Sequence, residues 1–231
     1  MLRALRIAAL LALVALSACG RNSTTTQSDQ LPDARELLSA SAKAMAELSS
    51  VSFLIDIGGE LSSAQIQQAE GTLTADGDVS ASAKLTQGGR LIEVEYVRVD
   101  GTSYLKLSTG GFREISDAVA ARIFDPATLL DAQNGVPAAL DAATDATTEA
   151  EEKVGGVDAY RVVAALDPEL IEGLSSLVSG QEQPFTLWIA AADDRLLKVT
   201  SAFEDPDTGD ETRLTVTFSN FNETVDIQAP L

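Results

Sequence analysis

The alternation of hydrophobic and polar residues divides this chain into segments of helical and of strand periodicity. After Asp33, apolar residues recur every three or four positions from residue 34 to 48, a spacing that predicts one amphipathic helix. From residue 51 to 57 every second residue is apolar, which predicts a strand with one buried face. The part of the chain with regular periodicity therefore begins with a helix followed by a strand.

Glycine-containing turn motifs divide the next stretch into hairpins. Asp76-Gly77, Gly88-Gly89 and Asp100-Gly101 each separate two runs of alternating residues. A two-residue turn at Gly88-Gly89 fixes the strand register and puts apolar residues on one face and charged residues on the other. The apolar pairs that this register predicts are Ala81 with Tyr96, Ala83 with Val94, and Leu85 with Ile92. The alanines leave room above this part of the sheet.

Helical periodicity returns in the middle of the chain. Residues 117–143 contain two predicted short helices, at 126–132 and 136–143, and a further amphipathic helix is predicted after Asp167-Pro168. Strands joined by a turn at Gly155-Gly156 separate these helical regions. Three alternating segments, FTLWIAA, RLLKVTSAFE and ETRLTVTFSNF, predict the last strands.

Together these segments predict an α+β fold with about eight to ten antiparallel strands in meander order. A long antiparallel sheet twists and coils, so we expect a strongly curved sheet with the helices across its open concave side. Aromatic residues make up only 5% of the chain and several inward strand positions are alanine, which favours an apolar cavity below the helices. A solid core built on the same strands is the alternative that periodicity leaves open.

The first residues of the chain have the organisation of a secretion signal. Residues 1–18 contain a basic start, an apolar run and a small-residue exit. The run is about ten residues long, whereas a helix needs about 20 to cross a bilayer core. The sequence LSAC at its end resembles the bacterial lipobox, which predicts cleavage before Cys19 and lipidation of its thiol. We expect residues 19–32 to form a flexible polar tether and residues 33–231 to form a single domain.

The charge of the chain and its lack of histidine narrow the classes of function. The net charge is −19, and removal of the leader with Arg3 and Arg6 lowers it to −21. Such a surface repels phosphate backbones, so we do not expect a nucleic-acid partner. The sequence contains no histidine, the commonest general base and a frequent zinc ligand. We therefore expect neither enzymatic activity nor a cofactor.

The acidic stretch EDPDTGDE, residues 204–211, invites comparison with a calcium-binding loop. Counted from Asp205, however, glycine stands at the fifth position instead of the sixth, and Val216 stands where the loop needs glutamate. We therefore expect a solvated hairpin tip and no metal site.

From the lipobox to its end, the chain resembles the LppX/LprG-type family of actinobacterial lipid-carrier lipoproteins. The resemblance rests on five stretches in the same order: LPDARELL, GTLTADGDVSASAKLTQGGRLIEVEYVRVDGTSYLKL, ARIFDPATLLDAQNGVPAAL, FTLWIAAADDRLLKVT and VTFSNFNETVDIQAPL. It implies a half-barrel sheet with helices across its open side, enclosing an apolar cavity for multi-acyl lipids or glycolipids. It also implies a protein anchored by lipid at the extracytoplasmic face of the cell membrane, which helps to move lipids across the envelope and has an envelope lipid transporter as a further partner.

Strand alternation, combined with the hollow face that the resemblance implies, predicts the residues that line the cavity. They are Phe53, Ile55, Ala81, Ala83, Leu85, Ile92, Val94, Tyr96, Val162, Leu187, Ile189, Val199 and Val216. The alternative function is that of a non-carrying accessory or scaffold lipoprotein with a filled core. A hydrolase that acts through carboxylates is a third possibility.

Overall fold

The computed structural model describes most of the chain after residue 30. The described ranges are 31–58, 66–87, 89–116, 118–120, 129–167, 170, 184–204, 209 and 211–230. They lie in one compact unit, Leu31–Leu231. The predicted signal and Cys19 fall outside these ranges, as do most of the tether, residues 126–128 of the helix predicted at 126–132, most of the helix after Pro168 and most of the acidic loop, so these stay predictions.

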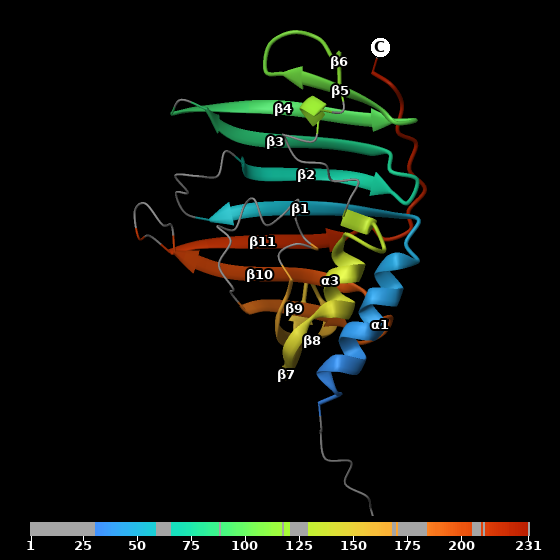
Figure 1. Cartoon of the computed structure of the whole chain (residues 1–231), viewed down its shortest axis with the longest axis vertical. Helices are drawn as coiled ribbons and strands as arrows, with labels where there is room; N and C mark the ends of the chain where they lie inside the picture. The colour runs from blue at the N-terminus through green and yellow to red at the C-terminus, as the bar shows by residue number, and fades with distance from the viewer. Residues whose placement is uncertain are drawn as a thin grey trace, which may run out of the picture. The chain divides into compact units, whose positions relative to one another are not determined.

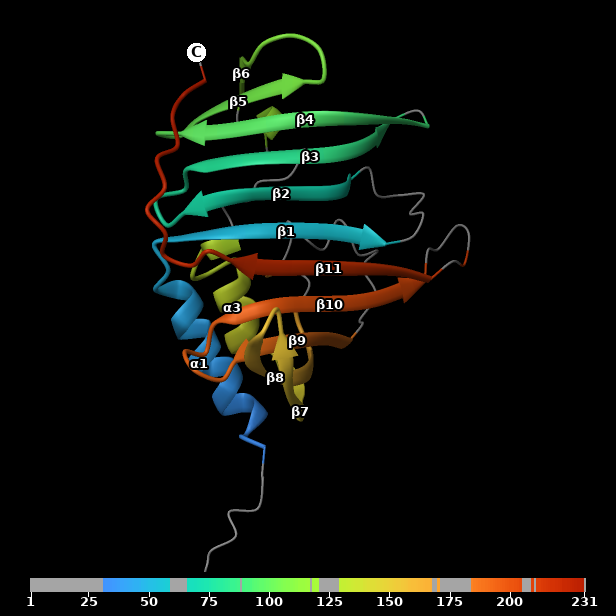
Figure 2. The same ribbon diagram turned by 180° about the vertical axis from the view of Figure 1, so that it is seen from behind.

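The described residues form one eleven-stranded antiparallel sheet. Its strands are β1 (Ser50–Gly58), β2 (Ile66–Thr74), β3 (Val79–Gln87), β4 (Arg90–Val99), β5 (Thr102–Leu107), β6 (Arg113–Ile115), β7 (Thr144–Val154), β8 (Val157–Ala165), β9 (Pro184–Ala190), β10 (Leu196–Glu204) and β11 (Glu211–Ser219). Their order in the sheet is β6-β5-β4-β3-β2-β1-β11-β10-β9-β8-β7 (Figure 1). Two meanders, β1–β6 and β7–β11, are thus joined where β1 pairs with β11. In Figures 1 and 2, β7 and β8 run at a steep angle to β1–β4.

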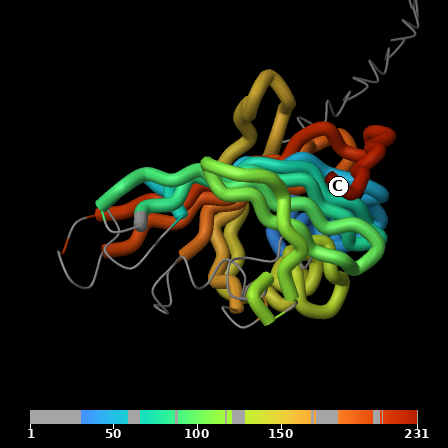
Figure 3. Tube along the Cα trace, turned by 90° about the horizontal axis from the view of Figure 1, so that it is seen from above, coloured from blue at the N-terminus to red at the C-terminus, as the bar shows by residue number. Residues whose placement is uncertain are grey.

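The segment between β6 and β7 has to pass from one edge of the sheet to the other, because these consecutive strands are its two edge strands. Its described part contains α3 (Val136–Ala142), which contacts α1 (Ala34–Ala46). Both helices lie on the same side of the sheet, as the view from above shows (Figure 3). We call this side the inner face. No helix of the described ranges has the length and apolar character needed to span a bilayer.

Helix α1 confirms the predicted helix and shows why it begins where it does. The Asp33 side chain accepts hydrogen bonds from the backbone N–H groups of Arg35 and Glu36, at 2.9 and 3.1 Å. These are N–H groups that the first helical turn leaves without a partner, so Asp33 is an effective N-cap. Leu38 and Met45 face the core and are fully buried.

The hairpin of β3 and β4 has the predicted register. Ala81 pairs with Tyr96, Ala83 with Val94, and Leu85 with Ile92. Strict alternation along β10 predicts that Leu197 lies on the same face as Val199. The observed register differs from this prediction. A bulge between Leu196 and Lys198 shifts the pairing with β9, so Leu196 joins the inner core and Leu197 packs in a small cluster with Ala159 and Ala190.

The C-terminal residues follow the ends of the strands. Residues 220–230 leave β11 and run past the ends of β1 to β4 (Figure 2). Asn222 fixes the start of this segment, because its side-chain oxygen accepts a hydrogen bond of 2.8 Å from the backbone N–H of Ser49. The Ser50 hydroxyl donates to the carbonyl oxygen of Glu223 at 2.6 Å. The segment is therefore tied to the beginning of β1.

Candidate functional site

Two apolar pockets lie on the inner face of the sheet. The α3 pocket is lined by Val136, Ala139, Leu140, Leu166, Phe185, Leu187, Leu196, Val199, Leu214, Val216 and Phe218. The β2–β5 pocket is lined by Phe53, Ile66, Ala69, Ala81, Ser82, Ala83, Leu85, Val94, Tyr96 and Leu105. One pocket belongs mainly to the C-terminal meander and the other mainly to the N-terminal meander, and Ser82 is the one polar residue in these two linings.

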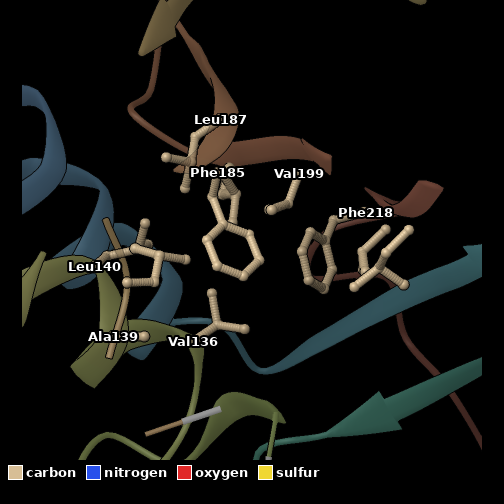
Figure 4. Close-up of a pocket in the computed structure, with 11 residues that line it drawn as sticks. Val136, Ala139, Leu140, Phe185, Leu187, Val199 and Phe218 are labelled. Carbon is tan, nitrogen blue, oxygen red and sulfur yellow. The ribbon is translucent and has the colours of Figure 1, made fainter. Parts of the chain in front are cut away.

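The α3 pocket is formed where α3 packs on β9, β10 and β11. Figure 4 shows Val136, Ala139 and Leu140 of the helix on one side and the rings of Phe185 and Phe218 on the other. A guanidinium NH group of Arg35 on α1 donates a hydrogen bond to the carbonyl oxygen of Ala143 at 2.5 Å. This bond satisfies a carbonyl group at the end of α3 and holds α3 against α1.

The β2–β5 pocket has a floor of small residues between two aromatic walls. In one row across the sheet, Phe53 pairs with Gly71, Gly71 with Ala81, and Ala81 with Tyr96. A Cβ atom at Gly71 would lie 2.7 Å from the Cβ of Ala81, so this row has no room for a larger residue at Gly71. Tyr96 is fixed by a hydrogen bond of 3.0 Å between its hydroxyl and that of Ser103. Small residues below and rigid rings at the sides leave an apolar hollow.

The two pockets differ in how well their walls are covered. In the α3 pocket Leu187 and Leu196 are fully buried, whereas Ala81, Ala83 and Leu85 of the β2–β5 pocket are only half-buried. The cavity volumes are about 20 Å³ in the α3 pocket and about 30 Å³ in the β2–β5 pocket. A single water needs about 10–15 Å³ by this measure, so the α3 pocket has room for about one or two waters and the β2–β5 pocket for about two or three. An acyl chain can enter only if the walls of a pocket move apart.

The structure brings nine of the predicted lining residues to these pockets. Phe53, Ala81, Ala83, Leu85, Val94 and Tyr96 line the β2–β5 pocket, and Leu187, Val199 and Val216 line the α3 pocket. Ile55, Val162 and Ile189 are at most 1% exposed in the core and line neither pocket. Ile92 is half-buried and also lies outside both linings.

Several lining residues were not in the predicted set. Phe185 and Phe218 follow the same alternation as Leu187 and Val216, so their strands already carried the signal. The residues from α3 needed a different signal, the apolar face of the predicted helix at 136–143. Periodicity identified that helix but not the strands on which it packs.

A larger groove lies over the opposite face of β2–β5 and has a different chemistry. It has a volume of about 460 Å³ and a mostly polar lining. Lys106 pairs with Glu95 at 2.6 Å, and Lys84 donates to Gln68 at 3.0 Å. Within the described ranges no group of three or more His, Cys, Asp or Glu residues is arranged to hold a metal ion. The two pockets with apolar linings thus lie on the inner face.

The sequence comparison identifies the family. Residues 33–227 match the LppX_LprAFG lipoproteins. The chain belongs to the LppX_LprAFG lipoprotein family. This is a family of lipid carriers and not of enzymes, which confirms both the resemblance and the expectation that the chain is not an enzyme.

Relatives with names and solved structures agree with this assignment. The lipoarabinomannan carrier protein LprG of Mycolicibacterium hassiacum is 30% identical over 234 residues, an alignment that covers 99% of this chain and 97% of that protein. The crystal structure of LprF from Mycobacterium bovis matches with a TM-score of 0.73 and 23% identity, covering 87% of this chain and 98% of LprF. LppX from Mycobacterium tuberculosis matches with a TM-score of 0.59 and 17% identity, covering 84% and 97%. The fold is thus LppX/LprF-like, and the described residues are mostly β, with the helices α1 and α3 beside the eleven-stranded sheet.

Proposed function

We propose that this protein takes up the acyl chains of a multi-acyl lipid or glycolipid on the inner face of its sheet and helps to transfer the lipid across the cell envelope. The observation that carries this proposal is the pair of apolar pockets, of which one has half-buried walls. The name of the relative LprG, a lipoarabinomannan carrier protein, supports a glycolipid as the ligand class.

The proposal includes a strongly curved half-barrel sheet whose two pockets widen into one cavity around a ligand. The steep angle between β7–β8 and β1–β4 in Figures 1 and 2 supports curvature. The small floor residues Ala69, Ala81 and Ala83 support widening on the N-terminal side. There the side chains of Leu85 and Leu105 are only half-buried.

The energetics of such a carrier are close to balanced. Burial of a methylene group is worth about 0.8 kcal/mol in a bilayer and about the same in a protein interior. Moving a chain from the membrane to the pocket therefore changes the apolar free energy little. The direction of transfer then depends on partners, among which we include an envelope lipid transporter.

Attachment at Cys19 completes the proposal, because it would keep the protein at the extracytoplasmic face of the membrane. The supporting observations are the LSAC sequence and the lipoprotein family. We expect Cys19→Ala in the full chain to move the protein from the membrane fraction to the soluble fraction. A Cys19→Ala protein that stays in the membrane fraction would contradict anchoring through this thiol.

Native mass spectrometry of the compact unit tests lipid carriage. Residues 31–231, purified from the cells that express them, are expected to retain lipid, and Ala83→Trp is expected to lose it while remaining folded. The matched control is Ala202→Trp, because Ala202 is exposed on β10. A lipid-free mass for the unmodified protein would contradict the proposal.

An accessory or scaffold lipoprotein with a filled core is the second candidate. The small volumes of the two pockets favour it. In that case Ala83→Trp should lower stability by overpacking, without any lipid to displace.

A further inference from the structure

The small floor of the β2–β5 pocket ends at a defined place along the strands. Paired residues of β2 and β3 form successive rows on the inner face: Ala69 with Ala83, Gly71 with Ala81, and Leu73 with Val79. The first two rows carry no side chain larger than a methyl group. The third row carries two branched side chains, so the hollow above the floor cannot continue past it.

The third row is also the most deeply buried of the three. Leu73 and Val79 are both 0% exposed, and neither lines the pocket. Val51 of β1, which pairs with Leu73, is equally buried. Beyond this row the chain turns through Asp76 and Gly77 between the two strands. The pocket is thus closed at the turn end of β2 and β3.

The other end of the pocket is more open. Leu85 lines the pocket there and is only half-buried, as is Ile92, its partner on β4. A chain lying between the walls formed by Phe53 and Tyr96 would therefore enter from the Leu85 end and point its methyl end at Leu73 and Val79. Each row adds two residues along a strand, which is about 6–7 Å of length.

From this geometry we infer that Leu73 and Val79 form a stop that sets the length of the acyl chain held in the β2–β5 pocket. The inference rests on the proposed function and assigns the residues that determine chain-length preference. Shortening either side chain lengthens the slot, and filling the preceding row shortens it.

The test is a competition among saturated fatty acids of increasing chain length. Residues 31–231 are incubated with an equimolar series, and the bound species are counted by native mass spectrometry. We expect Leu73→Ala and Val79→Ala to shift binding towards longer chains, by about fourfold for each additional methylene accommodated. Ala81→Leu, which moves the stop one row closer to the entrance, is expected to shift binding towards shorter chains.

The matched control is Val162→Ala, because Val162 is as deeply buried as Val79 but lies on β8, outside both pockets. It should leave the chain-length preference unchanged. If Leu73→Ala does not fold, Val79→Ala and Ala81→Leu still give opposite expected shifts. If both variants fold and their chain-length preference is unchanged, the inference that Leu73 and Val79 form a stop is wrong.

The failure of the stop and the failure of lipid carriage are distinguishable. A protein that retains lipid from its cells but shows no shift in these variants is a carrier without this stop. A protein that retains no lipid and binds none of the fatty acids overturns both proposals.

Discussion

The two meanders of the sheet follow the same hydrophobic alternation but differ in what lies over them. In the C-terminal meander, large side chains such as Leu187, Ile189 and Leu214 are at most 1% exposed, and α3 covers the pocket that Leu187 and Leu214 line. In the N-terminal meander, the inner positions Ala83 and Leu85 are small or only half-buried. Alternation therefore fixes which face of a strand is apolar, whereas residue size and the covering helices decide whether that face is packed.

This contrast assigns different tasks to the two halves. The C-terminal meander with α1 and α3 supplies the packed core, because buried side chains of normal density stabilise a fold most. The N-terminal meander is less completely packed around the paired residues Gly71 and Ala81, which are only half-buried. Such loosely covered apolar surface is costly unless something covers it, which is consistent with a ligand-binding role.

The largest expected effect contrasts a packed leucine with a half-buried one. We expect Leu187→Ala to lower the free energy of unfolding by about 3–4 kcal/mol, because it removes a fully buried side chain and leaves a cavity. Leu85→Ala, in the β2–β5 pocket, should cost about 1 kcal/mol, because much of that side chain is already in contact with water. Urea denaturation of residues 31–231 measures both, and equal losses would remove the contrast.

Adding a large side chain, instead of removing one, should also affect the stability of the two meanders differently. Ala164 is 1% exposed in the core, and we expect Ala164→Trp to cost about 2–3 kcal/mol through overpacking. The same ring at Ala83 should cost less than about 1 kcal/mol, because Ala83 is only half-buried and the ring can extend over the small floor residues towards solvent. Thermal unfolding of the two variants gives the comparison. A larger loss for Ala83→Trp than for Ala164→Trp would show that the N-terminal meander is the more tightly packed half.

A smaller effect concerns the helices that cover the C-terminal meander. We expect Asp33→Ala to cost about 1 kcal/mol, because the first turn of α1 loses its cap. Since α1 contacts α3 and β7, amide hydrogen exchange should become faster in α1 and α3 and stay unchanged in β3 and β4. Uniformly faster exchange across both meanders would mean that the halves do not respond separately.

The smallest expected effect is on the polar outer side of the N-terminal meander. The ion pair between Lys106 and Glu95 leaves the two side chains 33% and 49% exposed. Lys106→Ala should therefore change the free energy of unfolding by no more than about 0.5 kcal/mol. A loss of several kcal/mol in urea denaturation would show that the outer groove contributes to the core of this half.

Local sequence signals predicted the pairing of strands that are neighbours in the sequence. They did not predict the pairing of strands that are far apart in the sequence. The register of β3 and β4 followed from Gly88-Gly89, because a two-residue turn fixes the pairing of its neighbours. The pairing of β1 with β11, including Phe53 with Phe218, joins the two ends of the sheet, and no turn encodes it. For the same reason meander order holds within each half but not between β6 and β7.

For the candidate site, too, the sequence predicted local features but not those that depend on long-range packing. Alternation placed Ile55, Val162 and Ile189 on the inner face, where they are buried in the core. It could not tell them from pocket-lining residues, because that depends on the position of α3 and of neighbouring strands. The bulge beside Leu196 likewise depends on the pairing of β10 with β9 and leaves no mark in the pattern.

Photo-crosslinking with a lipid that carries a diazirine near the methyl end of its acyl chain tests the central claim most directly. If the inner face takes up acyl chains, peptide mapping should find the label on inner-face residues of β2, β3 and β4, with Ala81 and Tyr96 among them, and Ala83→Trp should remove it. Labelling confined to the outer face of the sheet, or labelling that Ala83→Trp does not affect, would contradict the account.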